Sequence, residues 1–201
     1  SESENAEAYA LYLKAKNIYE KRENTDDTEI AKALLKKAIQ LDENLIAAKL
    51  ILGDSYREVR YLDKAMEIYS SALTKSKELD DKLWIGRSTR KIGIVHANKG
   101  DVDTALDYYE RSLTIAEEIG DKYGMGASLN NIGIVYSNNG DKDTALDYYE
   151  RSLAIREEFG DKHEMGAILN NIGSLHADRG DYVNAIDYQS KSLAIFEGLG
   201  D

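Results

Sequence analysis

The side chains best suited to hold a ligand in this 201-residue chain are two pairs of asparagines that recur at a fixed spacing. Asn130 and Asn131 return forty positions later as Asn170 and Asn171. Since one carboxamide can donate and accept hydrogen bonds at once, amides repeated along a groove would hold an extended peptide backbone with little demand on its sequence. Alternatively, these asparagines bond between helices or came with duplication of a repeat. Both interpretations stay open for Asn131 and Asn171, whereas ligand binding is favoured for Asn130 and Asn170.

A basic cluster is the second feature with chemical potential. Arg87, Arg90 and Lys91 lie close together in a chain whose formal net charge is −11. Like charges this close repel one another unless they are solvated or countered. One interpretation is that they pair with nearby acids such as Asp80 and Asp81. The other is that they capture a carboxylate or an acidic motif through charge-assisted hydrogen bonds.

The residue types that carry catalysis or bind metals are scarce or badly placed. The chain has no cysteine, which excludes a disulfide and a thiolate metal site. Two of its three histidines, His96 and His176, fall in the repeat position that Tyr136 occupies in the middle copy, which predicts packing between helices. Acidic pairs such as Glu117 and Glu118 lie at repeated helix ends, where we expect them to be solvated. The sequence therefore predicts no enzyme, no cofactor and no metal site.

Composition limits the classes of partner. The acidic balance argues against nucleic acid, which draws most of its affinity from Lys and Arg, and against anionic membrane surfaces. No apolar run is long enough to span a membrane. The lack of cysteine fits a reducing compartment, so a cytoplasmic location is expected. A chain without proline that is rich in Ala, Leu, Glu and Lys favours helix almost throughout.

The elements that position these side chains follow from a repeat of 40 residues. The dipeptide Gly-Asp falls at 100, 120, 140, 160, 180 and 200, so it halves every repeat. Glycine readily adopts the left-handed conformation that ends a helix, and the aspartate after it can cap the next one. We therefore predict a corner at each Gly-Asp and helices over about 122–138 and 142–159. Gly133, with its counterparts Gly93 and Gly173, falls in mid-helix and predicts close packing against a neighbour.

The pattern inside each copy resembles the tetratricopeptide repeat. In the clearest copy, a Leu-Gly-like pair and a tyrosine on the first helix precede an alanine and an aromatic residue on the second: Ile132, Gly133, Tyr136, Ala145 and Tyr149. The resemblance covers nearly the whole chain. It departs from the family pattern in lacking the closing proline and in placing Gln189 where an aromatic residue is usual. Repeats of this length resemble those of kinesin light chains, Leu-Gly-Asn-type spindle adaptors and bacterial signalling proteins.

That resemblance implies an all-α fold, a right-handed superhelix of stacked antiparallel helix pairs. It divides the chain into a degenerate helix pair followed by four repeats: 4–44, 45–80, 81–120, 121–160 and 161–201. The last repeat is expected to be cut from a longer array. Its apolar residues, among them Ile186, Leu193 and Phe196, would then face an empty position, which makes self-association through this repeat one expected consequence.

The resemblance also implies a binding face, because the first helices of such repeats line the concave side of the superhelix. The predicted peptide-binding residues on this stripe are Arg87, Arg90, Lys91, Asn98, Asn130, Asn131, Asn138, Asn170, Asn171 and Asp178. Upstream, the same stripe includes Asp54 and Arg57. The implied function is a non-catalytic protein-interaction module that binds a peptide or partner segment, with an acidic or carboxylate group as a candidate feature of the ligand. The alternative is a regulatory or oligomerisation segment of a larger signalling protein, similar to the repeat regions of cyclases and kinases.

Overall fold

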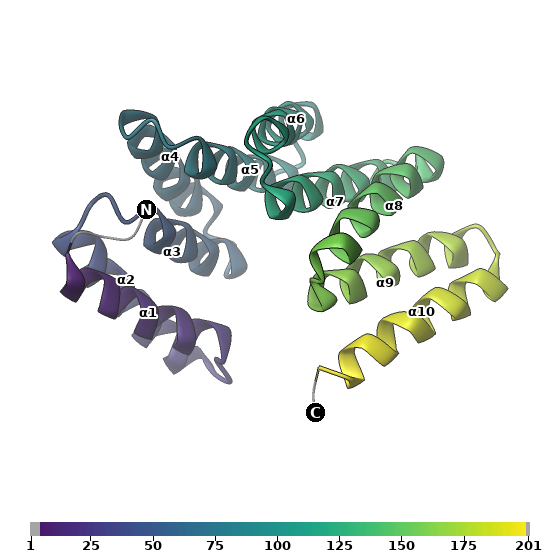
Figure 1. Ribbon diagram of the computed structural model, residues 1–201, viewed down its shortest axis with the longest axis horizontal. Coiled ribbons are helices and arrows are strands. Elements are labelled where there is room, and N and C mark those ends of the chain that lie inside the picture. Colours follow the sequence, from purple (N-terminus) through teal and green to yellow (C-terminus); the bar gives the residue numbers. More distant parts are fainter. Residues whose placement is uncertain (1–4, 200–201) are drawn as a thin grey trace. The chain divides into compact units, whose positions relative to one another are not determined.

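The computed structural model describes residues 5–199, and every regular element in that range is an α-helix (Figure 1). The all-α prediction is therefore confirmed for the described residues. The chain divides into two compact units, residues 1–101 and 102–201, and each is described by itself. Within residues 5–199, no helix is both long enough and apolar enough to cross a membrane.

Over the described residues 5–101, the first unit holds five helices: α1 (Ala6–Glu20), α2 (Thr25–Leu41), α3 (Ile46–Glu58), α4 (Leu62–Glu78) and α5 (Lys82–Asn98). Consecutive helices pack against each other, and α3 also contacts both α1 and α5. The odd-numbered helices therefore lie side by side. A core cluster collects small and aliphatic side chains from α1, α2, α3 and the residue just before α3: Ala8, Ala15, Leu35, Ala38, Leu45, Ala48 and Leu52.

Between residues 102 and 199, the described part of the second unit, the structure has five more helices: α6 (Val102–Ile119), α7 (Lys122–Asn138), α8 (Lys142–Phe159), α9 (Lys162–Asp178) and α10 (Tyr182–Glu197). The helices predicted over 122–138 and 142–159 are α7 and α8, with the same bounds. A core cluster joins α8 to α9 through Ala145, Tyr149, Ile168, Ile172 and Leu175. Figure 1 shows α9 and α10 side by side, in light green and yellow.

The corners between helices have the geometry that the Gly-Asp repeat predicts. The glycines at 100, 120, 140, 160 and 180 all have positive φ, between 69° and 84°. After three of them the aspartate side chain accepts a hydrogen bond from the backbone three residues on, for example from Thr144 N to Asp141 Oδ1 at 3.1 Å. The corner at Gly200 lies outside the described residues. Two corners of the first unit differ, because Arg60 and Asp80 take the left-handed position there.

The mid-helix glycines Gly133 and Gly173 each lie against a side chain of the partner helix, which agrees with the close packing that the sequence predicts. A Cβ atom added at Gly133 would lie 2.7 Å from the Tyr149 ring, and one at Gly53 would also meet the ring of Tyr69. At Gly173 the nearest atom is Cγ of the flexible Gln189 side chain, at 2.9 Å. These glycines therefore let the two helices of each pair approach closely.

Candidate functional site

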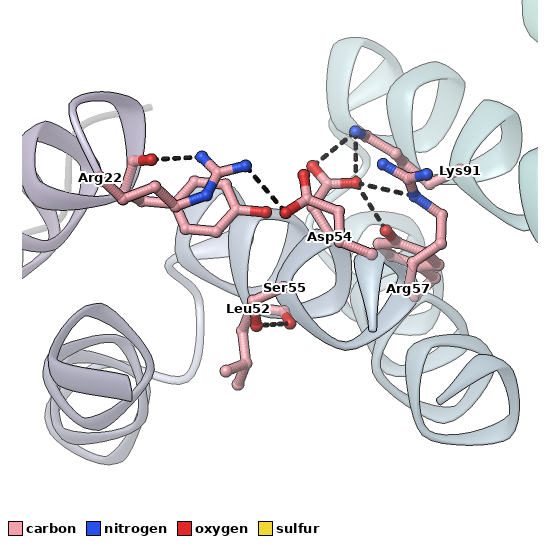
Figure 2. A network of polar contacts seen from close by, with 9 residues as sticks. Arg22, Leu52, Asp54, Ser55, Arg57 and Lys91 are labelled. Carbon is pink, nitrogen blue, oxygen red and sulfur yellow. Dashed lines mark hydrogen bonds and ion pairs between the residues drawn. The ribbon is translucent and has the colours of Figure 1, made fainter. Parts of the chain in front are cut away.

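The polar centre of the first unit is the carboxylate of Asp54 on α3 (Figure 2). The Lys91 ammonium group on α5 donates to both of its oxygens, at 2.6 and 2.7 Å. The hydroxyl of Tyr69 on α4 donates to Oδ1 at 2.7 Å, and Arg57 Nε lies 3.6 Å from the same oxygen. Three helices therefore meet at one acid, whose side chain is only 16% exposed.

Burial and charge act against each other in this cluster. Burial alone would raise the pKa of Asp54, but Lys91, the Tyr69 hydroxyl and Arg57 outweigh it and hold that pKa below its usual range. Burial lowers the pKa of Lys91; Asp54 opposes this shift, and the positive charges of Arg90 and Arg57 add to it. Burial also raises the pKa of the Tyr69 phenol. Asp54 is therefore ionised, and Tyr69 is a neutral donor, at neutral pH.

Positive charge exceeds negative charge around Asp54. Arg90 on α5 is 9% exposed, and its Nε has no hydrogen-bond acceptor among the described residues. Arg87, one turn earlier on the same helix, lies over the Trp84 ring at 5.2 Å. An ionised group away from water is costly unless it is countered. Arg90 is therefore a largely buried cation whose Nε is not satisfied by any described residue.

A second ion pair borders this cluster and is neutral as a whole. Arg22 Nη2 donates to Glu58 Oε2 at 2.8 Å, and its guanidinium group lies 4.0 Å from the Tyr19 ring centroid. Figure 2 shows Arg22 on the opposite side of Asp54 from Arg57 and Lys91. Because Arg22 is matched by Glu58, it does not add to the positive excess.

In the second unit, the corresponding stripe carries amides in place of charges. Asn171 Nδ2 on α9 donates to Asn130 Oδ1 on α7 at 3.3 Å, so the two stripes meet. The Asn131 amide nitrogen is buried without an acceptor among the described residues. Asn170 is exposed. Asn130 and Asn171 therefore form a hydrogen bond between helices, as one of the two interpretations expects. The side chain of Asn170 is exposed at the surface.

A pocket of about 410 Å³ borders Asn170 and Asn171. Its other lining residues are Ala167 on α9 and four residues of α10: Gln189, Ser192, Leu193 and Phe196. Sequence reasoning did not assign Gln189 to a site, and only its departure from the aromatic residue of the other copies marked it. The pocket combines carboxamides with an apolar wall, which suits a peptide backbone and an apolar side chain.

The remaining predicted residues lie at the ends of the same helices. Asn98 is half-buried at the end of α5, and Asn138 is exposed at the end of α7. Asp178, at the end of α9, is engaged: Lys142 Nζ donates to its backbone oxygen at 2.9 Å and lies 3.9 Å from its carboxylate. These three residues lie at the helix ends, away from the polar contacts of Asp54 and Asn130, which come from the middle of the helices.

The histidines take structural positions. His176 stacks on Tyr188 with ring centroids 5.4 Å apart, as Tyr136 stacks on Tyr148 in the preceding pair at 5.7 Å. His176 Nδ1 lies 3.1 Å from Asp181 Oδ2 at the following corner. Within residues 5–199, no group of three or more His, Asp or Glu side chains is arranged to hold a metal ion.

Comparison with known families identifies the repeat. Models of the tetratricopeptide repeat match residues 38–118, 84–158 and 130–199. Proteins of this family are protein-interaction modules, and they are generally non-catalytic scaffolds. A comparison with curated protein sequences found no match.

Solved structures support the same fold. The crystal structure of BtubC (BKLC) from P. vanneervenii is 21% identical, with a TM-score of 0.73 over 96% of this chain and 82% of that one. The Rap conjugation gene regulator of plasmid pLS20, in complex with the Phr* peptide, is 17% identical, with a TM-score of 0.84 over 96% and 54%. A putative kinesin light chain from Podosopora anserina with nearly identical TPR-like repeats is 14% identical, with a TM-score of 0.64 over 92% of both chains. Identities this low show the fold alone.

Proposed function

Because the chain belongs to the tetratricopeptide repeat family, we propose that it is a non-catalytic module that binds an acidic peptide or partner segment along the stripe of its first helices. The observation that carries this proposal is the positive excess around Asp54. Three cations, Arg57, Arg90 and Lys91, gather at a single carboxylate in a chain whose net charge is −11. Such a local inversion of charge favours a ligand that carries a carboxylate.

The two arginines of α5 are the residues we assign to the acid. Lys91 is already bound to both oxygens of Asp54, so its donors are largely used. Arg87 and Arg90 are three residues apart on one helix and therefore share a face. A guanidinium group offers a planar fork of donors that matches a carboxylate, and such charge-assisted bonds are stronger than neutral ones.

The amides of the second unit are assigned a different role. Asn170 presents an exposed carboxamide beside a pocket, and Asn130 and Asn171 bond to each other at its side. A carboxamide can donate to a backbone carbonyl and accept from a backbone N–H group, whatever the ligand's side chains are. The similar Rap regulator is in complex with a peptide, which supports a peptide as the ligand class here. The binding is therefore proposed to combine charge recognition in one unit with backbone recognition in the other.

The experiment measures binding of a fluorescein-labelled oligoglutamate peptide by fluorescence anisotropy. The double variant Arg87→Gln/Arg90→Gln is expected to bind about tenfold or more weakly, since each charge-assisted bond contributes more than about 1.5 kcal/mol. The matched control is Arg111→Gln/Arg151→Gln, because those arginines pair with Asp107 and Asp147 on exposed surfaces of α6 and α8. Equal affinity of the parent and the Arg87/Arg90 variant, with both folded by circular dichroism, would reject the proposal.

The cytoplasmic location remains a prediction from composition. The alternative function, a regulatory segment attached to a signalling enzyme, gains no support from any described residue. Self-association through the last helix pair is considered separately, because it would use the exposed apolar residues of α10, two of which, Leu193 and Phe196, also line the pocket beside Asn170.

A further inference from the structure

Helix α10 carries an apolar face that no described element covers. Val183 is 81% exposed, Ile186 is 66% exposed and Leu193 is 58% exposed. Tyr182 and Phe196 are exposed on the same helix. Residues at spacings of three and four lie on one side of a helix, so Tyr182, Ile186, Leu193 and Phe196 form a continuous stripe. Exposed apolar patches of this kind mark sites of association.

The preceding helix pair shows what such a stripe receives. The positions of Ile186 and Leu193 correspond to Leu146 and Leu153 on α8, forty residues earlier. Those two leucines are partly buried and pack into the core cluster that includes Ile168 and Ile172 of α9. The apolar stripe on α8 is therefore a docking surface for a helix, which we call a seat. Helix α10 carries the equivalent surface.

The edge of the seat differs between the two helices, and this difference limits the occupant. At the start of α8, Asp143 pairs with Arg179 at the end of α9, with the Oδ1 and Nη2 atoms 2.7 Å apart. In the first unit, Asp63 pairs with Lys99 in the same way, at 2.6 Å. On α10 the position of Asp143 is taken by Val183. A first helix of the ordinary repeat, with a cation at that position, would lose its ion pair there. The occupant of the α10 seat is therefore expected to be apolar at this edge.

We infer that the occupant is a second copy of this chain, whose α10 packs antiparallel to the first. With a two-fold axis between Gln189 and Ser190, Ile186 comes beside Leu193 of the second copy, and Val183 comes beside its Phe196. A two-fold interface pairs one patch with itself, so both exposed stripes are buried at once.

Charge does not oppose this contact at the stripe. The copies are both acidic, so the charges nearest the interface decide whether they can approach. Asp187 and Lys191 on α10 neutralise each other within the helix, with Lys191 Nζ 2.5 Å from Asp187 Oδ2. The contact is therefore apolar at its centre, and it brings no unpaired cluster of like charge from the middle of α10.

The test is light scattering coupled to gel filtration, over about a hundredfold range of protein concentration. The parent chain is expected to rise from the mass of one chain toward twice that mass. Ile186→Asp and Leu193→Lys are each expected to stay at the mass of one chain, because each leaves a charge against an apolar residue twice in the dimer. An equimolar mixture of the two variants is expected to recover the dimer, since one contact is then ionic and the other is apolar.

Three results would overturn the inference: a parent that stays monomeric throughout, a dimer that persists in Ile186→Asp, or a mixture that fails to associate. The control Leu13→Asp/Ile30→Asp removes two exposed apolar residues of the first unit and is expected to leave the dimer intact. The same measurement on Arg87→Gln/Arg90→Gln separates the two proposals, because that variant is expected to lose peptide binding and keep the dimer.

Discussion

The two units place different chemistry at the same position of the same repeat. In the first unit, Arg90 and Lys91 of α5 lie beside a buried carboxylate on α3, whereas in the second unit the equivalent positions of α7 and α9 are asparagines. One cluster is held by ions at 2.6–2.7 Å and the other by a single amide bond at 3.3 Å. The repeat therefore fixes the backbone and the direction of a side chain, while the residue type at that position differs from copy to copy.

This difference has an energetic side. A buried carboxylate that is paired with a lysine and a tyrosine cannot be removed alone, because the opposite charges would remain without a counter-ion. A neutral amide bond that is partly exposed can be lost at little cost. We therefore expect the first unit to tolerate changes at its polar centre far less than the second.

The largest effect is expected for Asp54→Ala. This change leaves Lys91, Arg57 and Arg90 without their carboxylate, and loss of one partner of a buried pair costs about 3–5 kcal/mol. The measurement is urea unfolding followed by circular dichroism. Lys91→Met combined with Asp54→Leu is expected to be less damaging than Asp54→Ala alone. A loss below about 1 kcal/mol for Asp54→Ala would mean that the cluster is solvated.

The same carboxylate predicts how stability depends on pH. Its folded pKa lies below the unfolded value of about 4, so its contribution is present above pH 4 and is lost as the pH falls through the folded pKa. The parent is therefore expected to lose stability more steeply below pH 4 than Asp54→Asn, in which this titration is absent. Parallel curves for the two proteins in acid would contradict the assignment.

Two mid-helix glycines of the second unit should differ in how well they tolerate a methyl group. Gly133→Ala in the second unit forces a methyl group against the Tyr149 ring, and overpacking of this kind costs about 1–3 kcal/mol, partly offset by helix propensity. Gly173→Ala meets Gln189 Cγ at 2.9 Å and the backbone oxygen of Ala185 at 3.2 Å; since Gln189 can rotate more easily than a ring, a smaller loss is expected. The melting temperatures of the two variants provide the comparison, and equal losses would show that the ring is not the obstacle.

A smaller effect of opposite sign is expected at a corner of the first unit. Arg60 has a φ of 64°, a conformation that costs a non-glycine residue about 1–2 kcal/mol and costs glycine far less. Arg60→Gly is therefore expected to stabilise the chain by up to about 1 kcal/mol, because greater freedom in the unfolded state opposes the gain. A destabilised variant would indicate that the Arg60 side chain contributes a contact.

The smallest effect is expected for Asn130→Ala. It removes one neutral hydrogen bond to Asn171 that is long, at 3.3 Å, and only partly buried, so the expected loss is about 0.5 kcal/mol, the low end of the usual range. A double-mutant cycle with Asn171→Ala isolates the coupling between the two side chains. A coupling as large as that of the Asp54 cluster would remove the distinction between the units.

Much of the fold could be predicted from the sequence because its signals are local. Glycine at a left-handed corner and aspartate as a cap each depend on a few neighbouring residues, and both recur in the structure. The bounds of α7 and α8 followed from the spacing of Gly-Asp alone.

The partner of the basic cluster could not be predicted by closeness in sequence. Asp80 and Asp81 were the nearest acids, but Lys91 pairs with Asp54, which is 37 residues away. In a 40-residue repeat, contacts between successive repeats, such as that of α3 with α5, bring together residues separated by nearly one period. Several other ion pairs have a separation of 36, including Arg22 with Glu58 and Arg179 with Asp143. A search for opposite charges at that separation would have found the site from the sequence.

The most direct test of charge recognition in the first unit compares two labelled peptides of equal length, oligoglutamate and oligoglutamine, against the parent chain at increasing salt. The account predicts tighter binding of oligoglutamate at low salt, and a loss of that preference as salt screens the charges. It also predicts that Arg87→Gln/Arg90→Gln shows no preference at any salt concentration. Equal binding of both peptides by the parent at low salt would contradict the account.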